Sequence, residues 1–194
     1  MGGFAHSAFA PVVLGFFGLG TGYLIYGPAE LFRFPARAPI VDRSLGVWGI
    51  FLPGLCQLVT GIILFVGLTW FQVFTDPPLY MAAVAFSAYG IHWFAIGWNR
   101  YQGNDPRPNV GMSVGFLIIS ALGAFVFFHA HAWPVGVLFV GLFCVYIGEF
   151  LVSIPMALGE KVLGVAHLAT GVWLMYLTVA TTLNIASGFH LPGG

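Results

Sequence analysis

The sequence predicts an all-α integral membrane protein, a bundle of six transmembrane helices, and three observations lead to this fold class. Hydrophobic residues make up 59% of the chain and charged residues only 6%, whereas soluble domains carry roughly 25% charged residues. The apolar residues form six stretches long enough to cross a bilayer, which takes about 20 helical residues. All six Lys and Arg residues fall in alternate loops between these stretches.

The six expected spans cover the whole chain, so residues 1–194 are predicted to form a single transmembrane domain. Gly27-Pro28 is expected to end the first helix, because proline lacks the donor that continues the hydrogen-bond ladder. The chain begins without a basic segment, so we expect the first helix to be retained and not cleaved as a signal peptide. The approximate spans are 8–28, 45–73, 78–99, 110–131, 134–157 and 162–186.

The positions of the basic residues predict the orientation of the bundle. Basic loops are retained in the cytoplasm, which predicts a plasma (inner) membrane protein with cytoplasmic basic loops and both termini outside. On these ranges no Lys or Arg lies inside a span. The net charge is zero, so no nucleic-acid partner is expected. The basic residues are Arg33, Arg37, Arg43, Arg100, Arg107 and Lys161.

Glycines repeat along single faces of the first two spans. Gly15, Gly18 and Gly22 share one face, and Gly54 and Gly61 share another. Small residues at this spacing let helix backbones approach closely in lipid. Two interpretations stay open: tight packing within the chain, or a face that forms an oligomer interface or narrows a pore.

Three polar residues inside the spans are candidates for a solute path or for proton coupling, because polar groups are costly at membrane depth. Gln57 shares a face with Gly54 and Gly61. His92 and Glu149 fall in the same half of the membrane, so a contact between them is expected to be feasible. The alternatives are that Glu149 only satisfies polar groups at the interface, and that His92 makes one structural hydrogen bond.

Two further stripes carry candidate residues. Phe86, Tyr89 and Trp93 share one face of the third span, where rings around one hydroxyl would suit a narrow constriction. The sixth span carries a polar stripe, and the alternative for its threonines is a bond to their own helix carbonyls. We treat His167, Thr170 and Thr178 as candidates for the polar path. The full stripe is His167, Thr170, Gly171, Leu174, Thr178 and Thr181.

Four histidines fall on the side predicted to be external: His6, His129, His131 and His190. His129 and His131 are candidates for sensing external pH, because histidine titrates near pH 6.5. Two histidines without a thiolate or carboxylate neighbour do not indicate a metal site. The chain also lacks a phosphate-binding glycine loop, a nucleophile elbow and a zinc-protease motif. We therefore expect neither an enzyme nor a bound cofactor.

Fragments of four spans resemble the acetate uptake transporter family, also called the SatP family. They are Ala10-Pro11 with Leu14, Phe17 and Gly18; Gly49-Ile50-Phe51 with Gly54, Gln57 and Gly61; Ala85-Phe86, Tyr89-Gly90 and Trp93; and Gly171, Tyr176-Leu177 and Leu183-Asn184. The resemblance implies a hexamer with a path through each protomer. It also implies that Phe17 and Tyr89 form a hydrophobic constriction and that Gln57 lies near the path.

Three features depart from that family. Ala8-Phe9 stands where the family has Asn-Pro, and Thr181 stands near an expected carboxylate. The charge pattern also predicts the opposite orientation. That orientation fits a related group, the AmiS/UreI urea and amide channels, which the chain resembles at Asn99, Asp105, Arg107-Pro108, Glu149 and Ile154-Pro155. The tryptophans of that group are replaced by Phe139 and Phe143, and its sixth-helix carboxylate by Thr170.

These observations predict a channel or proton-coupled carrier for a small solute, with acetate or a similar short monocarboxylate ranked first. Because no cation lies within the expected spans, passage of the neutral acid, or of the anion with a proton, is favoured. The first alternative is a urea or short-amide channel. The second is an accessory subunit of a larger membrane complex. The expected partners are the lipid bilayer, the small solute and further copies of the chain.

Overall fold

The computed structural model describes residues 10–193, and all regular structure in this part is helical. His6 and the Ala8-Phe9 pair lie outside the described residues. The helices are α1 (Val12–Leu31), α2 (Pro39–Gly49), the π-helical turn η1 (Ile50–Gly54), α3 (Leu55–Thr69), α4 (Pro78–Gln102), α5 (Asn109–His129), α6 (Trp133–Ser153) and α7 (Gly159–Ser187).

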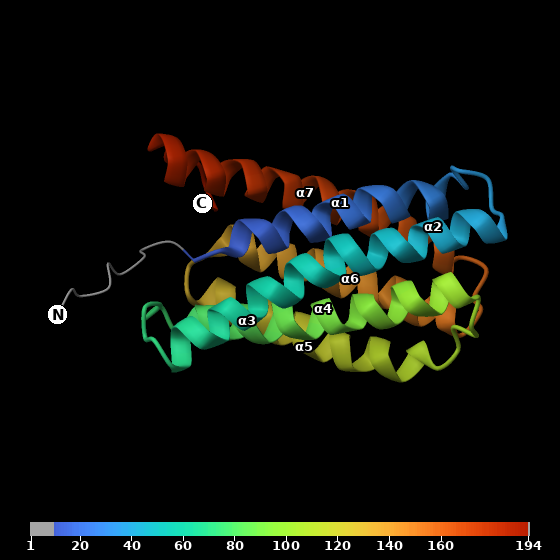
Figure 1. The fold of residues 1–194 in the computed structure, drawn as a ribbon, viewed down its shortest axis with the longest axis horizontal. Coiled ribbons are helices and arrows are strands. Elements are labelled where there is room, and N and C mark those ends of the chain that lie inside the picture. Colours follow the sequence, from blue (N-terminus) through green and yellow to red (C-terminus); the bar gives the residue numbers. More distant parts are fainter. Residues whose placement is uncertain (1–9, 194) are drawn as a thin grey trace.

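Six rods of helix run alongside one another, with α2, η1 and α3 joined into one (Figure 1). Contacts between neighbouring helices close the rods into a ring. α1 packs on α7, α7 packs on α6, α6 packs on α5, and α5 packs on α4. α4 packs on α2 and α3, and these two helices pack on α1. The ring encloses an interior to which each rod presents one face. Any path through the chain would follow this interior.

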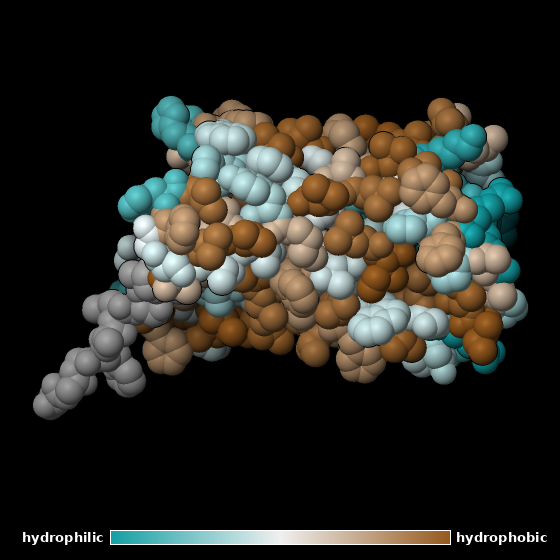
Figure 2. All heavy atoms as spheres, turned by 90° about the horizontal axis from the view of Figure 1, so that it is seen from above, coloured by the Kyte–Doolittle hydropathy of each residue, from teal (hydrophilic) through white to brown (hydrophobic). Residues whose placement is uncertain are grey.

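The composition of the helices matches a membrane environment. All six rods are long and apolar enough to span a bilayer. Figure 2 shows hydrophobic atoms over the middle of the molecule and hydrophilic atoms gathered at its two ends. The chain is therefore an integral membrane protein with six spans, as the sequence predicted. Its orientation and its assembly with other copies stay predictions.

All six basic residues lie at one end of the bundle, which we call the basic end. The α1–α2, α4–α5 and α6–α7 connections meet there, while the start of α1 and the end of α7 lie at the other end, which we call the far end (Figure 1). Arg107 in the α4–α5 connection pairs with Asp105, and this pair lowers the pKa of the Asp105 carboxyl to about 2.

The first helix does not end at Gly27-Pro28, so that prediction is wrong. α1 continues through Pro28 to Leu31. Proline removes only one ladder bond here, and the Pro28 carbonyl still accepts bonds from the amides of Phe32 at 3.0 Å and Phe34 at 3.2 Å. The extra turn carries Glu30 into the interior, where it is buried.

The second span starts earlier than predicted and contains a break. It runs from Pro39 to Thr69 instead of 45–73, and η1 interrupts its helical ladder around Pro53. Proline has no backbone N–H to donate, and its ring clashes with the preceding turn, so it disturbs the α-helical ladder where it stands. The earlier start places Asp42 in the first turn of α2, at the basic end.

The third span extends beyond residue 99, which corrects the expectation that no cation lies within a span. α4 ends at Gln102 and is capped by Gly103, whose φ of 70° suits a residue without a side chain. Arg100 is therefore helical, and only 25% of its side chain is exposed. The last turn of a helix is a favourable place for a cation, and burial additionally requires ion-pair partners.

Several glycines serve close packing within the chain, the first of the two interpretations given above. A Cβ on Gly18 would lie 2.4 Å from Cys56 Cβ, and one on Gly61 would lie 2.3 Å from Ser87 Oγ. A Cβ on Gly90 would lie 2.5 Å from the backbone nitrogen of Leu58. α1 and α4 thus touch α3 at glycines, where the backbones approach closely.

Gly90→Ala is expected to destabilise the protein by about 2 kcal/mol, because the new methyl group meets a backbone that only a shift of α3 can relieve. The matched control is Gly115→Ala in α5, where a Cβ has no neighbour within 4 Å. The control should be neutral or stabilising by up to about 1 kcal/mol. Thermal unfolding in detergent measures both, and equal midpoints would refute the close α3–α4 contact.

Candidate functional site

The interior contains a mostly apolar cavity at the far end, with a volume of about 220 Å³. Gln57, Tyr89 and Thr181 are among its few polar wall residues. Gln57 is buried, and its Oε1 atom has no hydrogen-bond partner in the described part of the chain. Tyr89 is satisfied, since its hydroxyl lies 3.0 Å from Ser120 Oγ. The apolar wall includes Phe16, Leu19, Phe86, Leu138, Leu142 and Leu174.

The segment after α7 folds back over this far-end cavity. The Asn184 side chain bonds both backbone groups of Leu191, at 2.7 and 2.8 Å, and the Tyr176 hydroxyl donates to the Pro192 carbonyl at 3.0 Å. Thr181 donates to the carbonyl of Gly193, and both residues line the cavity. The far-end cavity is thus partly walled by residues beyond the last span.

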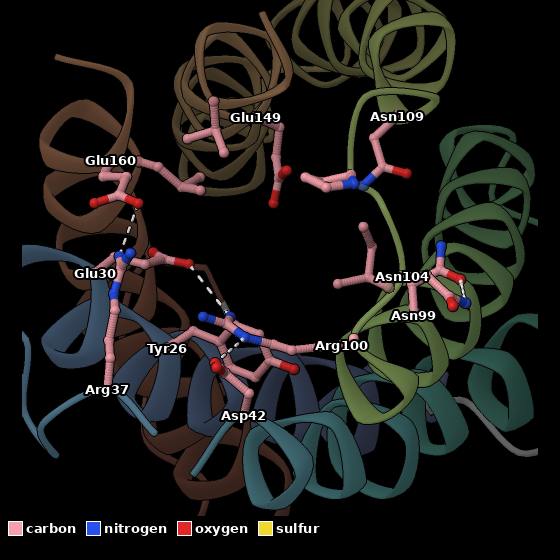
Figure 3. A pocket seen from close by; sticks show the side chains of 15 residues that line it. Tyr26, Glu30, Arg37, Asp42, Asn99, Arg100, Asn104, Asn109, Glu149 and Glu160 are labelled. Atoms are coloured by element: carbon pink, nitrogen blue, oxygen red, sulfur yellow. Dashed lines mark hydrogen bonds and ion pairs between the residues drawn. The ribbon is translucent and has the colours of Figure 1, made fainter. Parts of the chain in front are cut away.

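The basic end holds a second cavity, of about 300 Å³, whose wall is polar and charged. Figure 3 shows Glu149 of α6 pointing into it, across from the ion pairs that α1, α2 and α4 contribute. Arg37 and Glu160 pair at 2.8 Å and join the α1–α2 connection to α7. The charged residues of the wall are Glu30, Arg37, Asp42, Arg100, Glu149 and Glu160, and Asn99, Asn104 and Asn109 add amides.

Glu30 lies at the centre of a buried charge network in this basic-end cavity. Its Oε2 atom is 2.6 Å from His167 Nδ1, and its Oε1 atom is 4.0 Å from Arg100 Nη1. Arg100 Nε also bonds Asp42 Oδ1 at 3.3 Å, and its guanidinium lies over the Tyr26 ring. One carboxylate therefore joins α1 to α7 and α4, in a place where unpaired charges would be costly.

Five side chains fill the space between the two cavities, and we call them the aromatic layer: Tyr23, His92, Trp93, Tyr146 and His167. All are buried. Neighbouring ring centres lie 5.5 Å apart from Tyr146 to His92, 5.8 Å from His92 to Trp93, 6.0 Å from Trp93 to Tyr23 and 4.4 Å from Tyr23 to His167. This row runs from α6 through α4 and α1 to α7, so it crosses the interior.

The two cavities and the layer lie along the same helix faces. Residues three and four apart share one face of a helix. The order along α1 from far end to basic end is Phe16, Leu19, Tyr23, Tyr26 and Glu30, and along α4 it is Phe86, Tyr89, Trp93, Ile96 and Arg100. In each row the first two residues line the far-end cavity, the third lies in the layer, and the last two line the basic-end cavity.

Seven residues singled out from the sequence lie in this interior. Gln57, Phe86 and Tyr89 line the far-end cavity, His92, Trp93 and His167 belong to the layer, and Glu149 lines the basic-end cavity. Their roles in transport stay predictions. His92 Nδ1 lies 3.4 Å from the Tyr146 hydroxyl, which is the single structural hydrogen bond left open as the alternative, and the described residues show no hydrogen bond between His92 and Glu149.

Three candidates lie away from the interior path, which contradicts their expected place. Phe17 is 45% exposed on the outer side of α1. Thr170 packs against Gly141 of α6 beside a groove on the outer surface. Thr178 lines neither cavity and donates to the Leu174 carbonyl of its own helix at 2.8 Å, the alternative left open for these threonines.

The predicted pH-sensing histidines, His129 and His131, are exposed near the end of α5. Their response to external pH stays a prediction. Within residues 10–193 no three His, Cys, Asp or Glu side chains gather as metal ligands would. His131 has a left-handed backbone with φ of 57° in the tight α5–α6 turn.

Sequence reasoning does not make Glu30, Arg100, Tyr23 or Tyr146 a candidate, although Tyr146 shares a helix face with Glu149. The first two were assigned to loops because Pro28 and the polar 99–105 stretch indicated helix ends. Tyr23 and Tyr146 could have been found from the sequence, because a phenol hydroxyl inside a span needs a hydrogen-bond partner and therefore favours the interior of the bundle. Tyr23 lies between Leu19 and Tyr26 on the face that lines both cavities.

No family model matches the chain, and no curated protein matches it significantly. The resemblance to acetate transporters and to amide channels therefore stays a prediction made from short motifs.

Proposed function

We propose that this protein conducts a small, uncharged polar solute through the interior of each chain, with the neutral form of a short monocarboxylic acid such as acetic acid ranked first. The observation that carries this proposal is the pair of continuous residue rows on α1 and α4, which run from one cavity through the aromatic layer to the other. A closed layer between two cavities suits a gated channel or carrier.

The charges of the basic-end cavity favour a neutral solute. Arg37 and Arg100 are both engaged by carboxylates, and four carboxylates of the wall face these two guanidinium groups. A free anion would meet this negative excess and, at the far end, a mostly apolar wall whose charged residue, Asp76, is also a carboxylate. Transfer of an unpaired charge into either cavity is costly, so the acid is expected to enter the path with its proton, and a carboxylate is expected in the basic-end cavity only where a cation pairs with it.

One observation favours a short amide as the second candidate. The buried Gln57 Oε1 atom, unpartnered in the described chain, lies in the wall of the far-end cavity and can accept a bond from an amide N–H. It can accept equally from the O–H of a protonated acid. The two candidates therefore share one first contact and differ in whether the solute carries an acidic proton.

A solute panel separates these candidates. Proteoliposomes would be mixed in a stopped-flow instrument with acetate buffer, acetamide or urea, and swelling would be compared with that of protein-free vesicles. The proposal expects protein-dependent swelling with acetate and acetamide. Protein-dependent swelling with urea and not with acetate would replace the acid by the amide-channel assignment.

A non-transporting accessory subunit is the remaining alternative, and the size of the solubilised protein addresses it. Light scattering in detergent should give a homogeneous homo-oligomer, and the resemblance implies a hexamer. Stoichiometric co-purification with an unrelated membrane enzyme would favour the accessory role.

A further inference from the structure

A buried carboxylate–imidazole pair joins α1 to α7 where the aromatic layer meets the basic-end cavity. Glu30 Oε2 and His167 Nδ1 are 2.6 Å apart, and the side chains are only 7% and 1% exposed. Glu30 lines the cavity, whereas the His167 ring stacks on Tyr23 in the layer at 4.4 Å. The pair is thus in contact with both the basic-end cavity and the aromatic layer.

The groups around the pair carry more negative than positive charge. Arg100 of α4 is the nearest cation, and it is shared with Asp42 of α2. Such surroundings attract a proton, because low-dielectric walls strengthen the field of nearby charges. The titratable and charged groups that face the pair are Tyr23 and Tyr26 of α1, Asp42 of α2, His92 and Arg100 of α4, and Glu149 of α6.

We propose that the Glu30–His167 pair accepts the proton of a carboxylic acid as the acid crosses the aromatic layer, and that Arg100 then binds the resulting carboxylate. This inference rests on the proposed function. The O–H bond of the acid breaks, and its electrons stay on the solute oxygen. The proton forms a new bond to the Glu30–His167 pair. The pair later releases that proton to water in the basic-end cavity and returns to its starting state.

The position of Arg100 explains why proton transfer to the pair comes before binding of the carboxylate. Its Nη1 atom lies 4.0 Å from Glu30 Oε1, so Glu30 attracts the guanidinium while it is negatively charged. A proton on the pair weakens this attraction and leaves the guanidinium able to bind the carboxylate of the solute. An amide has no acidic proton to give, so its passage does not use the pair.

The experiment compares acetate and acetamide, which have nearly the same size, in proteoliposomes that contain wild-type protein, Glu30→Gln or His167→Gln. We expect each variant to lower the ratio of acetate to acetamide flux by at least about tenfold, a loss typical for a positioned proton acceptor. The matched control is Asp105→Asn, which removes a carboxylate from an exposed turn at the same end outside the cavity wall. Its ratio should equal that of wild type.

Acetamide flux also reports whether each variant is folded. If Glu30→Gln passes neither solute, the double variant Glu30→Gln, Arg100→Met, which removes one charge of each sign, is measured by the same ratio. A ratio equal to that of wild type, in any variant that passes acetamide, overturns the proposal. If wild-type protein passes acetamide and not acetate, the acid assignment is refuted. If it passes neither solute, the path itself is refuted. Either result also refutes the inference about the Glu30–His167 pair.

Discussion

Trp93→Ala is expected to open the passage to solutes that the wild-type protein excludes. The Trp93 ring lies in the middle of the aromatic layer, where it contacts Tyr23 and His92 and makes an edge contact with Tyr26 at 5.0 Å. Its removal joins the two cavities through the vacated space. Swelling of proteoliposomes with erythritol should become at least about tenfold faster than with wild type, which corresponds to a barrier lower by ~1.4 kcal/mol.

The control for this variant is Trp98→Ala on the same helix. Trp98 is 53% exposed on the outer surface of α4, so its loss leaves the layer intact. Trp93→Ala should also cost about 3–5 kcal/mol of stability because it leaves a cavity, and only protein that elutes as a single species in detergent would be reconstituted. Erythritol exclusion by such protein would show that Trp93 is not part of the barrier.

Arg100→Met is expected to destabilise the protein by about 3 kcal/mol. The substitution leaves Glu30 buried without its cation, and removal of one partner of a buried pair is strongly destabilising. We expect the lower end of the usual range because His167 still faces Glu30 at 2.6 Å. The midpoint of thermal unfolding in detergent, followed by circular dichroism, measures the loss.

The double variant Arg100→Met, Glu30→Gln tests the cause of that loss. Neutral partners have no charge left to compensate, so the double variant should recover most of the stability lost in the single variant. Asp42 stays hydrated, since 40% of its side chain is exposed. A double variant as unstable as Arg100→Met would mean that the Arg100 stem, and not its charge, stabilises this end of the bundle.

The spans could be predicted from the sequence because bilayer thickness alone fixes their length and apolar character. The ends of the spans could not be predicted, and the errors concern two residues of the basic-end cavity. The sequence indicates a helix stop at Pro28 and places Glu30 in a loop, although a proline near the last turn removes only one ladder bond. Arg100 is likewise placed in a loop, because it lies one residue beyond the expected end of its span.

The inward face of each helix was the second property that the sequence could not provide. A helix that is apolar on all sides gives no periodic signal that separates lipid from interior. The family resemblance places Phe17 in the constriction, and no periodic signal shows that it lies on the outer side, while Tyr23, buried in the layer, is not among the candidates. Amide, imidazole and carboxylate side chains are a better guide, since Gln57, His92, Glu149 and His167 all lie in the interior, whereas the hydroxyl candidates Thr170 and Thr178 do not.

Uptake of labelled acetate by wild-type proteoliposomes tests the central claim most directly. The account predicts uptake above that of protein-free vesicles, accelerated by an inward proton gradient and reduced by competing acetamide. Uptake equal to that of protein-free vesicles, with or without the gradient, would contradict a solute path through the aromatic layer.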